Sequence, residues 1–283
     1  MSDLGEYDLQ KEPVETVEPE PSRGAAWMVV AAIVLVLGAG AAFYILQRGT
    51  AESLSKPSDA APSARPPVVT DLRPEPGDNI PLPPLDETDP IVRQLVRQLS
   101  AHPTVAAWLA TDGLIRNFTV VTANIASGRT PVRHLGRLAP EQPFLVSGPE
   151  EKLMLDPRSY ARYDDYADAV AAIDARGAAR LYATLKPRIE EAHRELGEPE
   201  PTFDAVLEKA IAELLATPTV EGPVRLTVKP MSYAYADERL ESLSPAQKQL
   251  LRMGPHNVAM VKGKLREIAQ YLAIPPSRLP AER

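Results

Sequence analysis

The feature that most constrains this chain is an uncharged, apolar run near its start, from Ala25 to Leu46. At about 1.5 Å of rise per helical residue, these 22 residues reach about 33 Å, which is enough to cross a hydrocarbon core about 30 Å thick. Arg23 and Arg48 flank the run, and aromatic side chains stand near both ends, at the depth of the lipid headgroups. We therefore predict a single transmembrane helix whose partner is the lipid bilayer.

The residues before this run bear on the orientation in the membrane. Residues 1–24 are acidic and rich in proline, which predicts a disordered leader. A cleavable signal would have a basic start and a shorter apolar run, so we interpret the run as an uncleaved signal anchor. The basic residues on its two sides nearly balance, but long following domains translocate largely regardless of them. We expect a single-pass protein of a bacterial inner membrane with its C-terminal domain in the periplasm.

A proline-rich linker follows the run, over residues 47–84. It contains nine prolines between residues 49 and 84, with few apolar residues to anchor it. Proline-rich chain extends by about 3.1 Å per residue, so the linker reaches at most about 110 Å from the bilayer. Either this reach lets the domain meet something away from its membrane, or the linker is a slack tether.

Charge and cysteine content exclude several classes of function. Residues 85–283 hold 25 basic and 26 acidic side chains, so the predicted domain is nearly neutral. Nucleic-acid-binding domains carry a clustered basic surface, so we expect no nucleic-acid partner. The chain has no cysteine, which excludes disulfides, thiolate metal sites and a cysteine nucleophile.

The pattern from residue 85 to residue 279 predicts one mainly helical globular domain. Apolar residues recur at helical spacing, and proline, glycine and capping residues separate the helices. Asp89 is the expected N-cap of the first helix, and Pro187 predicts a kink or a break near Lys186. The expected helices cover residues 90–99, 114–125, 156–174, 178–196, 203–215, 245–253 and 255–272.

Shorter segments predict a small β element. Apolar and polar residues alternate over residues 224–229 and 232–235, and residues 143–146 and 152–155 are further candidates for short strands. The fold class is therefore mainly α with a small β element. Residues 129–149, which include residues 143–146, have little periodicity and predict a long irregular segment, and segments of this kind are often functional.

The most distinctive run lies in the helix expected over residues 156–174. Tyr160, Tyr163 and Tyr166 recur every three residues and should lie near one another. Arg158 precedes them, and Arg162 lies between Tyr160 and Tyr163. Tyrosine supplies rigid contact area with a polar tip, and arginine supplies a planar donor fork, so the five residues are candidates for a surface that recognises sugars or peptides. Alternatively, the rings pack at the edge of the core with their hydroxyls hydrogen-bonded.

Catalytic patterns are weak in this sequence. A glycosidase needs two carboxyl groups that face each other across the scissile bond, and sequence does not show such a pair. The candidates are Asp164, Asp165, Asp168, Glu190 and Glu191, and adjacent acids on a helix usually form a solvated face. The histidines, at positions 102, 134, 193 and 256, show no metal-binding spacing and no triad arrangement. We therefore predict no cofactor, no metal and no catalytic residue.

Three segments carry a resemblance to a known family. They are Asp156–Tyr163, Leu185–Ile189 and Leu243–Pro255. They resemble a bacterial membrane-anchored family catalogued only as a domain of unknown function, and the similarity covers most of residues 80–272. The resemblance implies this architecture and no activity, and it supplies no catalytic residues.

Two functional hypotheses follow. The first is a single-pass envelope protein whose C-terminal domain binds a protein or cell-wall partner without catalysing a reaction. The alternative is a membrane-tethered hydrolase that acts on peptidoglycan. A shallow surface of tyrosine and arginine would favour the first, and a deep cleft with two facing carboxylates would favour the second.

Overall fold

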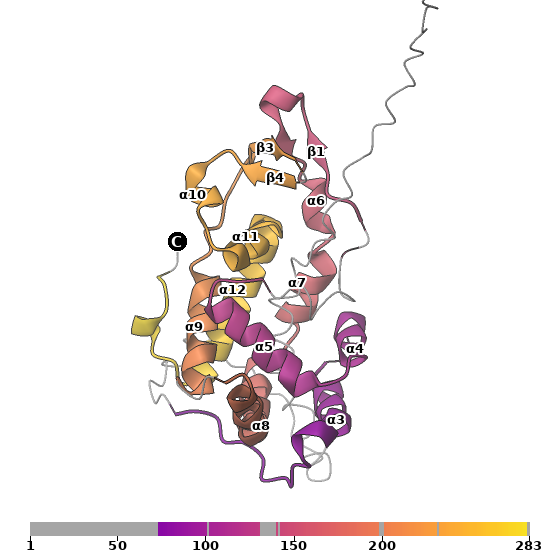
Figure 1. Ribbon diagram of the computed structural model, residues 1–283, viewed down its shortest axis with the longest axis vertical. Coiled ribbons are helices and arrows are strands. Elements are labelled where there is room, and N and C mark those ends of the chain that lie inside the picture. Colours follow the sequence, from indigo (N-terminus) through magenta and orange to yellow (C-terminus); the bar gives the residue numbers. More distant parts are fainter. Residues whose placement is uncertain are drawn as a thin grey trace, which may run out of the picture.

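The computed structural model describes residues 73–100, 102–130, 140, 142–197, 201–230 and 232–281. The predicted leader, the predicted membrane span from Ala25 to Leu46 and residues 47–72 of the predicted linker lie outside them. Within the described residues, the prediction of a mainly helical fold with a small antiparallel β element is confirmed (Figure 1). None of the helices in this part of the chain combines the length and the apolar character needed to cross a bilayer.

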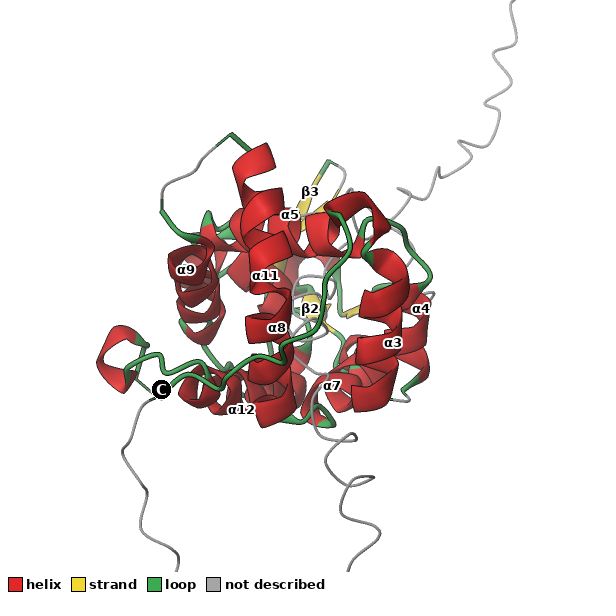
Figure 2. Cartoon of the chain, turned by 90° about the horizontal axis from the view of Figure 1, so that it is seen from below, coloured by secondary structure: helices red, strands yellow, loops and turns green. Residues whose placement is uncertain are grey.

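Helices build the larger part of the domain. They are α3 (Asp89–Leu99), α4 (Pro103–Leu109), α5 (Leu114–Ala126), α6 (Arg158–Ala161), α7 (Asp164–Ala171), α8 (Ala175–Glu195), α9 (Phe203–Leu215), α10 (Glu238–Glu241), α11 (Pro245–Leu251) and α12 (Gly254–Tyr271), with short 3-10 helices at Leu85–Glu87, Glu150–Lys152 and Pro276–Arg278. Helix α5 packs against α8 and α9, and α12 packs against α7, α8 and α9 (Figure 2). Helix α3 contacts α5 and α8, and α4 contacts α7. The expected helices match these elements closely, except for α4 and α10, which were not predicted, and the run of residues 156–174.

The main hydrophobic core lies between these helices. Phe118 of α5 and Phe203 of α9 are fully buried, and their ring centroids lie 5.5 Å apart. Other large side chains that are fully buried include Leu114, Ile115, Ile125, Tyr163 and Leu185. Helical spacing brings the apolar residues of each helix onto one face, so burial of these faces holds the bundle together.

The β element forms one end of the molecule (Figure 1). Its strands are β1 (Val146–Ser147), β2 (Met154–Leu155), β3 (Leu226–Lys229) and β4 (Ser232–Tyr235). Strand β1 pairs with β2 and β3 with β4, both antiparallel, and a bridge between Met154 and Arg225 joins the two hairpins. A second, smaller core of apolar side chains lies beneath them, with Leu251 of α11 among its members.

Two helix starts show how local and distant contacts combine. Ser244 and Gln247 form a capping box at the start of α11. Asp89 was expected to cap its own helix, and this prediction is wrong, because α3 begins at Asp89 with Thr88 as its N-cap residue. The carboxylate of Asp89 instead accepts hydrogen bonds from the backbone N–H groups of Gly113, at 2.7 Å, and Leu114, at 2.8 Å. It therefore caps α5, whose first N–H groups have no helical partner.

Residues 73–84 of the predicted linker pack along α8 as an extended segment, which we call the strap (Figure 2). Glu75 donates its backbone N–H to the carbonyl of Tyr271 at 3.1 Å, and Asp78 pairs with Arg180 of α8. A Cβ atom on Gly77 would lie 2.6 Å from the backbone of Ala183, so only glycine permits this close approach.

Pro187 does not break α8, which runs from Ala175 to Glu195. Because proline has no N–H group, Pro187 cannot donate to the carbonyl of Ala183, four residues earlier. The strap lies against that same part of the helix, at Gly77. The predicted break is therefore wrong, because α8 continues through Pro187 with the strap packed against it nearby.

Candidate functional site

The tyrosine and arginine run does not form a single helix. The predicted helix over residues 156–174 is wrong, because the chain forms two short helices, α6 and α7, with Arg162 and Tyr163 at the junction between them. The hydroxyl of Ser159 both donates to the carbonyl and accepts from the N–H of Leu145, which ties α6 to the β1 segment. The break separates the tyrosines, so they do not share one stripe.

The three tyrosines have different surroundings. Tyr163 is fully buried in the main core, and Tyr166 packs partly buried against that core. Tyr160 packs against the smaller core beneath the hairpins. Burial raises the pKa of Tyr160 and of Tyr163 above the usual value for tyrosine. The rings of Tyr160 and Tyr163 therefore serve mainly to pack the two cores, as the alternative interpretation of the sequence proposed.

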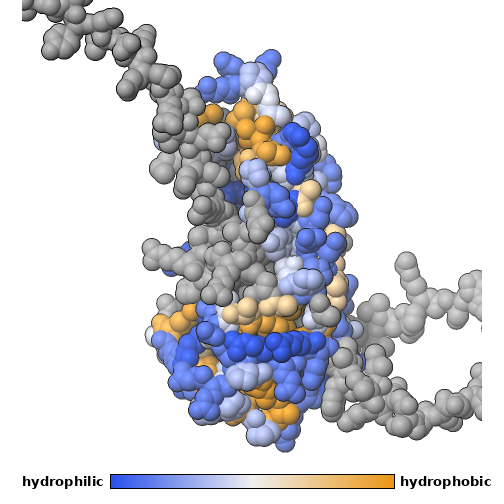
Figure 3. Space-filling view, turned by 90° about the vertical axis from the view of Figure 1, so that its right-hand side faces the viewer, coloured by the Kyte–Doolittle hydropathy of each residue, from blue (hydrophilic) through white to orange (hydrophobic). Residues whose placement is uncertain are grey.

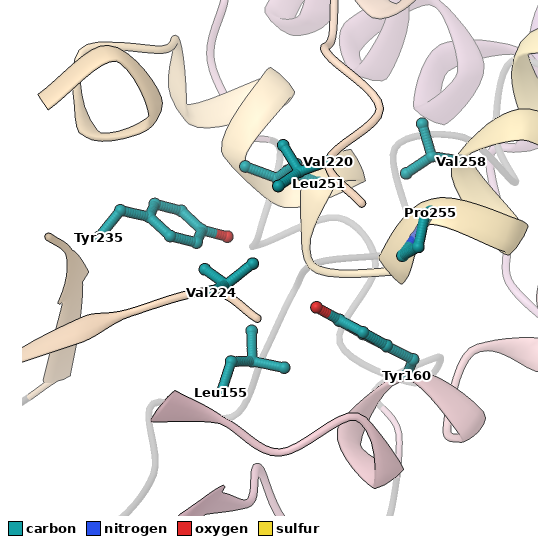
Figure 4. Close-up of a pocket in the computed structure, with 8 residues that line it drawn as sticks. All are labelled: Leu155, Tyr160, Val220, Val224, Tyr235, Leu251, Pro255 and Val258. Atoms are coloured by element: carbon teal, nitrogen blue, oxygen red, sulfur yellow. The ribbon is translucent and has the colours of Figure 1, made fainter. Parts of the chain in front are cut away.

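Tyr160 also lines a small gap between the β element and α12 (Figure 4). Its hydroxyl and that of Tyr235 point toward this gap from opposite sides. Burial raises the pKa of Tyr235 to about 12. The gap has room for about one water molecule, so it is a packing feature and not a pocket for an organic ligand. The residues that line it are Leu155, Tyr160, Val220, Val224, Tyr235, Leu251, Pro255 and Val258.

Arg158 and Arg162 lie in different settings. The side chain of Arg158 is 78% exposed and forms an ion pair with Asp156 at 2.6 Å. The hydrogen bonds from Arg158 hold the pKa of Asp156 below its usual value. Arg162 is half-buried and donates from Nη2 to the hydroxyl of Tyr163 at 2.7 Å. Its guanidinium carbon lies 4.8 Å from the ring centroid of Tyr163 and 5.3 Å from that of Phe144, which are cation–π distances.

Phe144 links Arg162 to the β3–β4 hairpin. The ring centroids of Phe144 and Tyr233 lie 5.7 Å apart. Tyr233 is 37% exposed and pairs across the hairpin with Val228, which is 51% exposed. We call these four residues, Phe144, Arg162, Val228 and Tyr233, the hairpin surface. In Figure 3, apolar and charged side chains lie side by side at the hairpin end of the molecule.

One apolar face of the β3–β4 hairpin extends beyond the smaller core, so the outer part of that face stays exposed. Leu226 and Tyr235 form a cross-strand pair that is buried in the smaller core. Side chains two residues apart on a strand share a face, so Val228 and Tyr233 extend the same apolar face outward. The alternation over residues 224–229 predicted this face, but sequence alone did not show where its cover ends. Phe144 likewise lies in the irregular segment that was singled out as functional.

The carboxylates considered for hydrolysis either bind neighbouring side chains or lie exposed. Asp164 accepts a hydrogen bond from Asn257 at 2.8 Å, and Glu191 pairs with Arg188 at 2.5 Å. Asp165 and Asp168 are exposed on α7, and none of these acids lines the gap near Tyr160. Within the described residues, no cluster of three or more histidine or acidic side chains is arranged to hold a metal ion.

The fold and the hairpin surface define a helical domain with a small β element that presents an aromatic and cationic patch. A family model described as a protein of unknown function, DUF3014, matches residues 114–269. The match covers more than half of the chain, so this protein belongs to the DUF3014 family, as the resemblance of the three segments predicted. It extends from α5 into α12 and includes the whole hairpin surface. No curated protein and no solved structure matches the chain.

Proposed function

We propose that this protein is a single-pass protein of a bacterial inner membrane whose C-terminal domain binds a protein or cell-wall partner in the periplasm without catalysing a reaction. The observation that carries the binding function is the exposure of Val228 and Tyr233 beside Phe144 and Arg162. Exposed aromatic and apolar side chains next to an arginine are typical of recognition surfaces. The described carboxylates give the alternative, a peptidoglycan hydrolase, no comparable support.

The position of the hairpin surface fits a tethered domain. The strap reaches the domain beside Tyr271, at the C-terminal end of α12, and Gly254 at the other end of this helix lies against Tyr160. A helix of 18 residues is about 27 Å long, so the linker enters the domain far from the β element. With residues 25–46 as the proposed anchor, the chain would enter the domain at the end opposite the hairpin surface.

Site-specific photo-crosslinking in intact cells tests this function. A photo-crosslinking amino acid is placed at Val228 in the full chain, and, as a matched control, at Leu196, which is 42% exposed at the far end of α8. We expect a discrete adduct with a protein or with cell-wall material from position 228 and none from position 196. Absence of an adduct from position 228, or the same adducts from both positions, would contradict a partner at the hairpin surface.

A further inference from the structure

A line of polar contacts joins the strap to α8 (Figure 2). Three arginines of the helix bind the strap, two of them through a carboxylate and one through a backbone carbonyl. The contacts follow both segments in the same order: Glu75 with Arg176, Asp78 with Arg180, and Leu82 with Arg188. The first and the last of these arginines are 12 residues apart, so the strap runs along about 18 Å of the helix, in the direction of its chain.

The strap contributes little to the hydrophobic core. None of residues 73–84 is buried, and the first buried residue after them is Leu85, which belongs to the main core. Within the strap, Leu82 packs partly buried against that core. The end of the strap next to Leu85 is therefore fixed by apolar packing, whereas residues 73–81 depend on contacts at the surface of α8 and α12.

Surface contacts of this kind give residues 73–81 a low local stability. The side chain of Arg176 is 68% exposed, and exposed ion pairs contribute little to folding and are screened by salt. Two backbone hydrogen bonds add to them, from Glu75 to the carbonyl of Tyr271 and from Asp78 to the hydroxyl of Thr184. Segments with few buried apolar contacts open at a much smaller cost in free energy than the core does.

The packed position of the strap is nevertheless specific. A Cβ atom on Gly77 would lie 2.6 Å from backbone atoms of both Ala183 and Thr184, so any other side chain at this position would separate the strap from α8. The carboxylates of the strap also lie opposite arginines of the helix. The strap on α8 is therefore a defined state that a modest free energy separates from an open one.

We propose that residues 73–81 form a latch, which opens and closes on α8 while the rest of the domain stays folded. When the latch is closed, the chain enters the domain beside Arg176, and when it is open, the chain enters at Leu82. Opening adds nine residues to the tether, or about 28 Å of extended proline-rich chain. The latch thus sets how far the domain reaches from its membrane. This effect on reach rests on the proposed anchor at residues 25–46, whereas the opening itself does not.

Hydrogen exchange of the full chain in mild detergent tests the opening. The reporters are the N–H groups of Glu75 and Asp78, whose hydrogen bonds form when the latch is closed. We expect them to exchange at least about a hundredfold faster than the N–H of the buried Val261 in α12, and at least about tenfold more slowly than in a free peptide of residues 70–84. Exchange as slow as that of Val261 would show that the latch opens only with the whole domain. Exchange as fast as in the peptide would show that it never closes, and either result overturns the inference.

Matched variants assign the exchange to the contacts of the latch. Gly77→Ala should raise the exchange rates of Glu75 and Asp78 at least about tenfold and leave that of Val261 unchanged, and Gly263→Ala is the control, because a Cβ atom at Gly263 has open space. Arg176→Gln should raise the same two rates several-fold, and Arg194→Gln, at an exposed position near the other end of α8, should not. Unchanged rates in Gly77→Ala, or equal effects of the two arginine variants, would overturn the inference.

Single-molecule pulling measures the gain in length. The chain has no cysteine, so handles are attached to cysteines introduced as Pro74→Cys and Ala281→Cys in the full chain. We expect an extension step of about 20–30 Å below the force that unfolds the domain, because about eight residues leave α8, and Gly77→Ala should remove this step. A parent chain that extends only when the domain unfolds would overturn the latch. Neither measurement involves the hairpin surface, so a missing adduct from position 228 would reject the binding function alone, and a missing early step would reject the latch alone.

Discussion

Val228 and Tyr233 face each other across the β3–β4 hairpin and remain exposed, although Leu226 and Tyr235, the next pair on the same face, are buried. The sheet thus carries an apolar face beyond the core that it covers. The helices of the domain bury their apolar faces, so folding does not require this exposed extension of the hairpin. Its exposure is therefore the structural basis of the binding function that we propose.

Helix α12 offers a matched pair of glycines for testing the packing of the β element. Gly254 has φ +83°, and a Cβ atom there would lie 2.4 Å from the Tyr160 ring, whereas Gly263 has open space around its Cβ position. Gly254→Ala should lower the free energy of unfolding by about 2–4 kcal/mol. Gly263→Ala should raise it by up to about 1 kcal/mol, because alanine favours the helix. Urea unfolding of both variants checks this, and equal effects would be inconsistent with the packing of Tyr160 on Gly254.

The carboxylate of Asp89 is expected to hold the start of α5 in place. Asp89→Ala removes the acceptor for the N–H groups of Gly113 and Leu114 and should cost about 1–2 kcal/mol of stability. Asp112→Ala is the control, since its side chain is 97% exposed, and it should cost less than about 0.5 kcal/mol. Chemical denaturation measures both. Similar losses in the two variants would argue against a capping role for Asp89.

The buried Tyr235 predicts a loss of stability at alkaline pH. Its pKa is about 12 in the folded chain and about 10 when unfolded, so between these values the unfolded state releases a proton that the folded state keeps. Stability should be unaffected by Tyr235 below about pH 10 and should fall as pH rises toward about 12. Urea unfolding across this range should show a smaller fall for Tyr235→Phe than for the parent chain. Parallel curves would show that Tyr235 does not titrate as proposed.

Membrane orientation can be tested independently of binding. A reporter that is active only in the periplasm, fused after Pro280 of the full chain, should be active if residues 25–46 anchor the chain with its C-terminal domain outside the cytoplasm. A reporter active only in the cytoplasm serves as the control at the same position. Activity of the cytoplasmic reporter alone would reject the orientation and, with it, a periplasmic partner.

The sequence predicts the elements whose signals are local. The capping box at Ser244 and Gln247 and the helical spacing of apolar residues in α5, α9 and α12 need no knowledge of distant contacts, and these helices are confirmed. Features that depend on distant contacts were predicted less well. Asp89 caps a helix that begins 25 residues later, and the strap packs on α8 about 100 residues away. Neither partner leaves a pattern within a short stretch of sequence.

The candidate site shows the same division. Arg162 was predicted as a binding residue from the tyrosine and arginine run, but this run forms two helices that direct Tyr163 into the core. Phe144 was placed in a candidate strand within the irregular segment, and Tyr233 in another candidate strand. Their contact was not predicted, because it joins segments almost 90 residues apart.

The central claim is that the protein binds its partner through the hairpin surface. The most direct test changes an exposed side chain of this surface without changing the fold. Val228→Thr keeps the shape of the side chain and the strand preference, and as an exposed substitution it should shift the melting temperature by no more than about 2 °C. Leu196→Ser removes an exposed apolar side chain far from the hairpin and is the matched control. The measurement is the amount of the partner crosslinked at position 228 that each full-length chain retains in a pull-down from envelope extract. We predict that Val228→Thr reduces this amount at least about fivefold and that Leu196→Ser leaves it unchanged. Full retention by Val228→Thr, or an equal loss with Leu196→Ser, would contradict binding at the hairpin surface.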